Sequence, residues 1–103
     1  MELLLGFLSG MFLVNSIPHL VTGINGKSHM TPFAKNSSAV VNVIWAFINI
    51  IIGIWILVYS QHGITDVFAF DNFSWSFWGG ALFMALGCAW LFGNKNARFP
   101  WFK

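Results

Sequence analysis

Four polar side chains stand inside long apolar stretches of this sequence and could do chemistry there; they are Asn15, His19, Asn42 and Asn49. The histidine is the most suggestive, because its ring titrates near physiological pH and an ionisable group in such a stretch is a candidate functional residue. Carboxamides donate and accept hydrogen bonds, so they can line a polar path or pair with a neighbouring helix. A purely structural role for His19, at an interface or at a bend beside Pro18, is the alternative.

The elements that must position these residues follow from the distribution of charge. Charged residues make up 8% of the 103 residues and hydrophobic residues 57%, whereas soluble domains carry about 25% charged residues. A bilayer core of roughly 30 Å needs about 20 apolar helical residues. The sequence therefore predicts an all-α fold, a single membrane domain of three transmembrane helices over residues 3–24, 39–59 and 73–92. Pro18 is expected to bend the first helix, because proline removes a backbone hydrogen bond.

The charges outside the spans predict an orientation. Lysine and arginine favour cytoplasmic loops, and here they occur in the loop 25–38 and the tail 93–103, whereas the loop 60–72 carries only acidic charges. We therefore expect a protein of the inner (plasma) membrane, with its N-terminus outside and its C-terminus cytoplasmic. The net charge of +2 follows from this topology, and nothing in it suggests nucleic acid. The cationic loop could also hold a lipid phosphate; a simple connector is the alternative.

Small residues mark the faces on which the predicted helices can pack. They let two helix backbones approach closely, and in lipid this packing is a main source of helix association. The first helix carries its glycines and its polar residues on nearly opposite faces, so two of its faces are unsuited to lipid. A homo-oligomer or a larger membrane protein partner could use the second face, and so could a second helix of the same chain. The predicted packing residues are Gly6, Gly10, Gly53, Ser76, Gly80 and Gly87.

The depth of the polar residues predicts which of them pair. At about 1.5 Å per residue, Asn15 and Asn49 lie at similar distances from the cytoplasmic ends of their spans, and His19 and Asn42 both lie nearer that end. We expect two hydrogen-bonded pairs between the first two helices, Asn15 with Asn49 and His19 with Asn42. Such bonds average about 0.6 kcal/mol in membranes, so the pairs would fix register more than they would stabilise.

Enzyme chemistry has little support in the sequence, and we expect no enzyme activity. There is one cysteine, Cys88, so an internal disulfide is impossible. The three histidines fall in one span and in two loops on opposite sides of the membrane, and their spacing matches no standard ligand motif. We therefore predict no metal site and no cofactor. Asp66 and Asp71 could form an acid–base pair, but solvated loop charges are the simpler explanation.

Part of the chain resembles a known group of proteins. The segments that carry the resemblance are Asn15-Ser16-Ile17-Pro18-His19, then Gly23, Thr31-Pro32-Phe33 and Ser38-Ala39-Val40-Val41-Asn42. They are similar to segments of a family of small uncharacterised bacterial inner-membrane proteins that cross the membrane several times. The resemblance covers roughly the first half of the chain. It implies a bacterial inner-membrane location, but no activity is attached to the family, so it implies no functional residues.

Two functions fit these features. The first is a structural or accessory membrane protein that associates with itself, with membrane lipid or with another membrane protein; the charge-free spans and small-residue faces favour it. The alternative is a small homo-oligomeric transporter or channel in which Asn15, His19, Asn42 and Asn49 line the path. Transport sites often lie near the bilayer midplane at broken helices, and the expected bend at Pro18 is a weak form of that arrangement.

Overall fold

The computed structural model describes residues 1–94, 96 and 98–102 and is mostly helical. Its three long helices are α1 (Glu2–Ile24), α2 (Ala39–Tyr59) and α3 (Asn72–Phe92). Each is long and apolar enough to cross a bilayer. The predicted all-α membrane fold is therefore confirmed, and the predicted span limits agree with the helices to within one residue. Two of the predicted tail charges, Lys95 and Lys103, lie outside the described residues.

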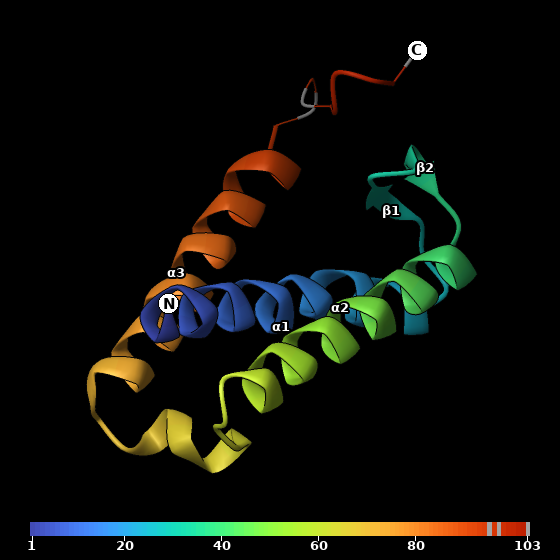
Figure 1. Cartoon of the computed structure of the whole chain (residues 1–103). Helices are drawn as coiled ribbons and strands as arrows, with labels where there is room; N and C mark the ends of the chain where they lie inside the picture. The colour runs from blue at the N-terminus through green and yellow to red at the C-terminus, as the bar shows by residue number, and fades with distance from the viewer. Residues whose placement is uncertain (95, 97, 103) are drawn as a thin grey trace.

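The first helix is the centre of the bundle. It packs along both α2 and α3, while α2 and α3 make almost no direct contact within the described residues. Figure 1 shows α2 and α3 joined at one end through η1 (Ile64–Phe68) and leading away from each other toward the hairpin and the C-terminus. The two faces of α1 that are unsuited to lipid are thus both occupied inside one chain, so they give no independent indication of self-association.

Glycine allows the close approach of α1 and α3. A Cβ atom on Gly80 would overlap the backbone carbonyl of Phe7, and a Cβ atom on Gly10 would overlap that of Phe77. Backbone atoms cannot turn aside as the end of a side chain can, so only glycine fits at these two positions. On the other face of α1, the Ser9 hydroxyl donates to the carbonyl oxygen of Gly53 at 2.8 Å. Gly6, Gly10, Gly53, Ser76 and Gly80 therefore lie at helix contacts, as predicted.

Gly87 is an exception among the predicted packing residues. It is exposed, and a Cβ atom added to it would meet no atom within 4 Å. The prediction that Gly87 packs against a helix is wrong within this chain. Helical periodicity places it on the same stripe as Gly80, but at this height α3 meets α1 through the neighbouring Cys88, which contacts Asn15, and Gly87 faces away from that contact. Gly87 instead borders a cavity.

The loop 25–38 is more ordered than a simple connector. It forms an antiparallel hairpin of β1 (His29–Thr31) and β2 (Ala34–Ser37). The hydroxyls of Thr31 and Ser37 lie 2.6 Å apart in its buried interior. Across the hairpin's outer surface, the indole Nε1 of Trp101 donates to the Pro32 carbonyl at 2.7 Å. The described part of the C-terminal segment thus lies at the hairpin end of the bundle.

The two ends of the bundle have different interiors. At the η1 end the core is apolar and consists of Leu57, Val67, Phe73 and Phe77, with Leu13 against them. At the hairpin end the buried residues are mainly polar, and they include His19, Asn42 and Asn49 at 2%, 0% and 1% exposure. A polar interior is stable only when its groups are hydrogen-bonded, so the partners of these side chains define the site.

The helix limits have local causes. The Ser38 hydroxyl accepts a hydrogen bond from the Val41 amide at 3.2 Å and begins α2, as expected of a serine N-cap. In α1 the helix runs on through Pro18. The Ser16 hydroxyl donates to the Leu13 carbonyl at 2.6 Å, beside the Val14 carbonyl that loses its backbone donor to the proline. The bend itself stays a prediction.

Candidate functional site

Both predicted polar pairs are present between α1 and α2. The Nδ1 atom of His19 lies 2.8 Å from Oδ1 of Asn42, and Nδ2 of Asn15 donates to Oδ1 of Asn49 at 3.1 Å. The four predicted site residues therefore come together as two hydrogen-bonded pairs one above the other.

Asn42 connects three parts of the chain. Its Nδ2 atom lies within hydrogen-bond distance of the carbonyl oxygens of His29 (2.9 Å), Ser37 (3.1 Å) and Ser38 (3.0 Å). Three surrounding acceptors assign the amide group unambiguously, because an oxygen at that place would have no donor. The opposite atom, Oδ1, can then only accept, so Nδ1 of His19 carries a proton. A neutral His19 ring consequently has its free lone pair on Nε2.

A chain of three hydrogen bonds joins all three helices. The Cys88 thiol donates to Oδ1 of Asn15 at 3.6 Å. Asn15 donates to Asn49, and Nδ2 of Asn49 donates to the carbonyl of Trp45 at 2.8 Å. Because each side-chain amide both donates and accepts, this chain fixes the orientations of Asn15 and Asn49. It also fixes how α3 and α2 lie against α1 at mid-height.

A cavity of about 240 Å³ lies beside these pairs, between α2 and α3 on the hairpin half of the bundle. It forms there because α2 and α3 lead away from each other beyond η1. The cavity is partly open, and none of the described residues that line it is charged. Its walls come from three helices, the hairpin and the C-terminal segment; the lining residues are Asn15, His19, Met30, Pro32, Trp45, Met84, Gly87, Cys88, Leu91, Phe92 and Phe99.

Two nitrogen atoms of the lining residues have no partner within the part of the chain that the structure describes. The indole Nε1–H of Trp45 is buried and makes no hydrogen bond. His19 uses Nδ1 for Asn42, and its Nε2 makes none. A buried donor without a partner costs about 1–3 kcal/mol. The cavity therefore has mainly apolar walls, and the unpaired Nε1–H of Trp45 is itself buried rather than open to the cavity.

A second histidine stands next to this cavity. The ring of His29 lies 5.2 Å from that of His19 and 4.1 Å from that of Phe92, measured between ring centres. Its Nε2 atom is buried and has no partner among the described residues. Removal from water lowers the pKa of His29, and the nearby His19 ring lowers it further when charged. Both effects favour the neutral form of His29.

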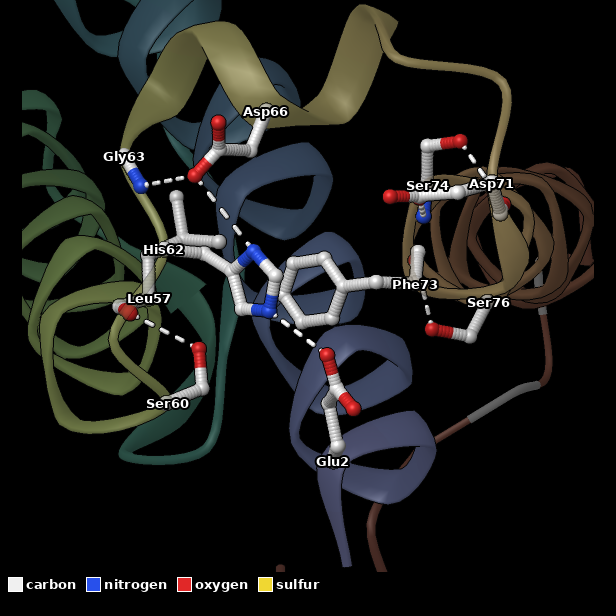
Figure 2. Close-up of polar contacts among 10 residues, drawn as sticks. All are labelled: Glu2, Leu57, Ser60, His62, Gly63, Asp66, Asp71, Phe73, Ser74 and Ser76. Atoms are coloured by element: carbon white, nitrogen blue, oxygen red, sulfur yellow. Dashed lines mark hydrogen bonds and ion pairs between the residues drawn. The ribbon is translucent and has the colours of Figure 1, made fainter.

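A separate polar cluster lies at the η1 end, as Figure 2 shows. Nε2 of His62 is 2.7 Å from Oε1 of Glu2, and Nδ1 is 3.4 Å from Oδ2 of Asp66. The ring stacks on Phe73 with 3.7 Å between ring centres and an angle of 7°. Asp66 also accepts a hydrogen bond from the Gly63 amide at 2.7 Å. This cluster ties the start of α1 to the loop between α2 and α3.

The two aspartates of that loop act as local caps. Asp71 accepts from the Ser74 amide at 2.9 Å and begins α3. This backbone hydrogen bond is the main cause that lowers the pKa of the Asp71 carboxyl, and the hydroxyl of Ser74 adds to it. Asp66 contacts His62 and the backbone of η1 instead. Their separate partners favour the explanation as structural loop charges over an acid–base pair.

The sequence interpretation missed several residues of the site. Trp45, Met84, Phe92 and His29 line or border the cavity, but apolar residues on a predicted span carry no signal that separates a cavity wall from a lipid-facing surface. The contact between Glu2 and His62 could have been suspected, because the predicted topology puts both residues on one side of the membrane. Among the described residues, no group of three His, Cys, Asp or Glu side chains is placed to hold a metal ion.

Comparison with known proteins adds no family to this description. No protein-family model matches the chain, and no curated protein or solved structure is significantly similar to it.

Proposed function

We propose that this chain is an accessory membrane protein that binds a lipid-like, amphipathic molecule of the bilayer in the cavity between α2 and α3. The observation that carries the proposal is the composition of that cavity. Its walls are mostly aromatic, aliphatic and thioether side chains, and the polar groups among them are few and come from separate helices. Sites for small molecules in proteins typically have this combination of apolar walls and a few placed polar groups.

The surface around the cavity supports a ligand that arrives from lipid. The outward faces of α2 and α3 are apolar over their whole length; exposed examples are Ile51, Trp55, Leu82, Leu86 and Trp90. A molecule dissolved in the bilayer can reach the space between two such helices without crossing water. A second copy or a larger protein partner would have to bind an outward-facing surface of the bundle, since both inner faces of α1 are in use.

The pairing of the polar residues favours binding over transport. A transporter or channel would need Asn15, His19, Asn42 and Asn49 to offer free polar groups along a path. Asn42 and Asn49 are instead fully buried and engaged with α1 and with backbone carbonyls. Of this set, Asn15 and His19 line the cavity, which suits one stationary ligand better than a succession of solutes.

The charge distribution supports a placement in the bacterial inner membrane with the hairpin end in the cytoplasm. Lys27 and Lys35 belong to the hairpin loop, and Glu2, Asp66 and Asp71 belong to the opposite end, in accord with the positive-inside rule. In a Cys88→Ala background, a membrane-impermeant maleimide should label Gln61→Cys from outside intact cells. It should label Ser28→Cys only after the cells are opened; the reverse pattern would refute this orientation.

Filling the cavity tests the binding function. Gly87 borders the cavity and has free space around it, so Gly87→Leu should occupy the cavity without disturbing the bundle. The matched control is Gly79→Leu on the same helix; Gly79 is exposed, and a Cβ atom there meets its nearest neighbour, Phe7, at 4.0 Å. Native mass spectrometry from mild detergent should show a retained small molecule on the wild type and on Gly79→Leu but not on Gly87→Leu. Equal retention by all three, or none on the wild type in the presence of extracted membrane lipid, would overturn the proposal.

A further inference from the structure

A second hollow lies at the hairpin end of the bundle, next to the cavity. We call it the surface hollow; it has a volume of about 240 Å³ and lies between the hairpin and the C-terminal end of α3, which lead to the same end of the molecule in Figure 1. Met30, Leu91 and Phe92 line both spaces, so the surface hollow and the cavity are direct neighbours. Its other lining residues are Ser28, His29, Lys35, Asn36 and Asn94.

The surface hollow offers hydrogen-bond donors. The Ser28 hydroxyl donates to Oδ1 of Asn36 at 2.9 Å, and the Asn96 amide donates to Oδ1 of Asn94 at 3.0 Å. Because both carboxamide oxygens already accept a hydrogen bond, the NH₂ groups of Asn36 and Asn94 are left to donate to a ligand. Both residues are exposed, so a ligand can reach them. The group that they bind must be an acceptor.

The charge of the surface hollow favours an anion. Lys35 lines it and is exposed, and none of the described residues that line it is acidic. The C-terminal end of α3 contributes partial negative charge, so the positive charge of Lys35 is what makes the hollow attractive to an anion. Phosphate offers only acceptor oxygens, and lysine binds it as a point charge. A phosphate group therefore matches both the lysine and the two amides.

The neighbouring cavity indicates the source of the phosphate. A soluble anion has no use for apolar walls beside its site, whereas the phosphate of a phospholipid lies at the membrane surface with its acyl chains directly below. In the orientation proposed above, the surface hollow lies at the cytoplasmic surface. The walls of the cavity reach from Phe92, beside the hollow, to Asn15 near the middle of α1. The two spaces thus have the polarity and the order in depth of a phospholipid head and chain.

We infer that the surface hollow binds the phosphate of an anionic phospholipid of the cytoplasmic leaflet, through Lys35 and the amides of Asn36 and Asn94, and that one acyl chain of this lipid enters the cavity past Met30 and Leu91. This inference rests on the proposed function. It goes further by naming the head of the bound molecule and the residues that select it, whereas the proposed function requires only an amphipathic molecule.

Lipids with identical acyl chains and different heads test the inference. Dioleoyl phosphatidylglycerol carries a net negative charge, dioleoyl phosphatidylcholine carries the same phosphate with a compensating cation, and dioleoylglycerol has no phosphate. Titration in mild detergent with native mass spectrometry gives the affinity for each. Phosphatidylglycerol should bind about fivefold more tightly than phosphatidylcholine, the factor that corresponds to the attraction of about 1 kcal/mol between one lysine and an anionic lipid surface. Dioleoylglycerol should bind more weakly than either.

Two lysines of one loop separate a specific site from a general attraction between positive charge and anionic lipid. Lys35→Gln should remove the preference for phosphatidylglycerol over phosphatidylcholine, and Lys35→Arg, which keeps the charge, should retain it. The matched control is Lys27→Gln, because Lys27 is exposed in the same loop and is not among the described residues that line the surface hollow. It should leave the preference intact. Equal losses in Lys27→Gln and Lys35→Gln would overturn the inference.

The two amides are tested by a different pattern of affinities. Asn36→Ala combined with Asn94→Ala should weaken phosphatidylglycerol and phosphatidylcholine alike, because both lipids carry the phosphate to which the amides donate. The affinity for dioleoylglycerol should not change. Unchanged affinities for both phospholipids would show that these amides do not bind the phosphate.

The outcomes separate this inference from the proposed function. Gly87→Leu should weaken both phospholipids, whereas Gly79→Leu should weaken neither. If Gly87→Leu has this effect but the wild type shows no preference for phosphatidylglycerol, the proposed function stands and the inferred head is wrong. If the preference depends on Lys35 but Gly87→Leu binds like the wild type, the proposed function fails, and so does the inferred path of the acyl chain. If glycerol 3-phosphate displaces phosphatidylglycerol at equal concentration, the surface hollow is a site for a soluble anion and the inference is overturned.

Discussion

Nδ1 of His19 lies 2.8 Å from Oδ1 of Asn42, across the contact between α1 and α2. The pair is buried, with His19 at 2% and Asn42 at 0% exposure. Asn42 is important because its amide nitrogen, Nδ2, also lies within hydrogen-bond distance of carbonyl oxygens in the hairpin and at the start of α2. One side chain thus holds together the histidine, the hairpin and a helix terminus, and it determines which nitrogen of His19 remains free.

Asn42→Leu should destabilise the protein more than Asn49→Leu. The first change leaves the Nδ1–H of His19 and backbone carbonyls of the hairpin without hydrogen-bond partners. A buried unsatisfied group costs about 1–3 kcal/mol. The second removes a bond of the kind that averages about 0.6 kcal/mol between membrane helices. Unfolding in mixed detergent micelles measures both losses. Equal losses would mean that Asn42 contributes no more than an ordinary interhelical hydrogen bond.

Cysteines at positions 15 and 49 should crosslink. The side chains of Asn15 and Asn49 touch at 3.1 Å, so Asn15→Cys with Asn49→Cys, in a Cys88→Ala background, brings two thiols together. The control combines Asn15→Cys with Ile51→Cys, because Ile51 is 63% exposed on the outward side of α2. Mass spectrometry of the digested protein detects the link. Failure of the first pair with reagents of several lengths would contradict the contact.

Gly80→Ala should destabilise the bundle while Gly87→Ala should not. The added methyl group at position 80 overlaps the carbonyl of Phe7, and forcing extra atoms into a packed contact costs about 1–3 kcal/mol. At position 87 the methyl group meets nothing within 4 Å, and alanine is the better helix former by about 0.5–1 kcal/mol. The same unfolding assay compares them. A loss of stability in both variants would mean that another group packs against Gly87.

Stability should fall as the pH drops below the ordinary histidine value, and His29 should be one cause. Burial lowers the pKa of His29 below 6.5. Below that pH the unfolded chain binds a proton that the folded chain does not, so protonation favours unfolding. Unfolding midpoints measured from about pH 8 down to about pH 5 cover the titration of unperturbed histidine. His29→Gln should flatten this dependence.

The pH test has an internal control. Among the described residues, the titratable groups around His29 are His19, whose ring is adjacent, and Lys35, which borders the same surface hollow. The lowered pKa of Asp71 affects stability only as the pH falls below the ordinary value of 3.8, where protonation removes its cap. Its contribution therefore lies outside the window of His29. An unchanged pH profile in His29→Gln would contradict this role of His29.

The sequence by itself determined the helices and the two polar pairs. Span limits depend on the length of charge-free runs, which is a local property that lipid enforces on each segment separately. The pairing of Asn15 with Asn49 and of His19 with Asn42 followed from depth along two antiparallel helices joined by a short loop. Few alternatives remain once buried amides must find partners across one contact.

Only the tertiary structure decided which helix is central, and the cavity follows from that. Helical periodicity gives the direction of a side chain relative to its own axis, but it does not say where the neighbouring helices lie. Trp45 and Ala46 are adjacent in sequence, yet Ala46 is fully buried against α1 while Trp45 lines the cavity. Gly80 and Gly87 lie on the same stripe of α3, yet of these two glycines only Gly80 packs against α1. Glu2 meets His62 only when the helices have packed. These contacts depend on the angles at which the helices cross. Each crossing angle is set jointly by all the side chains packed between the two helices.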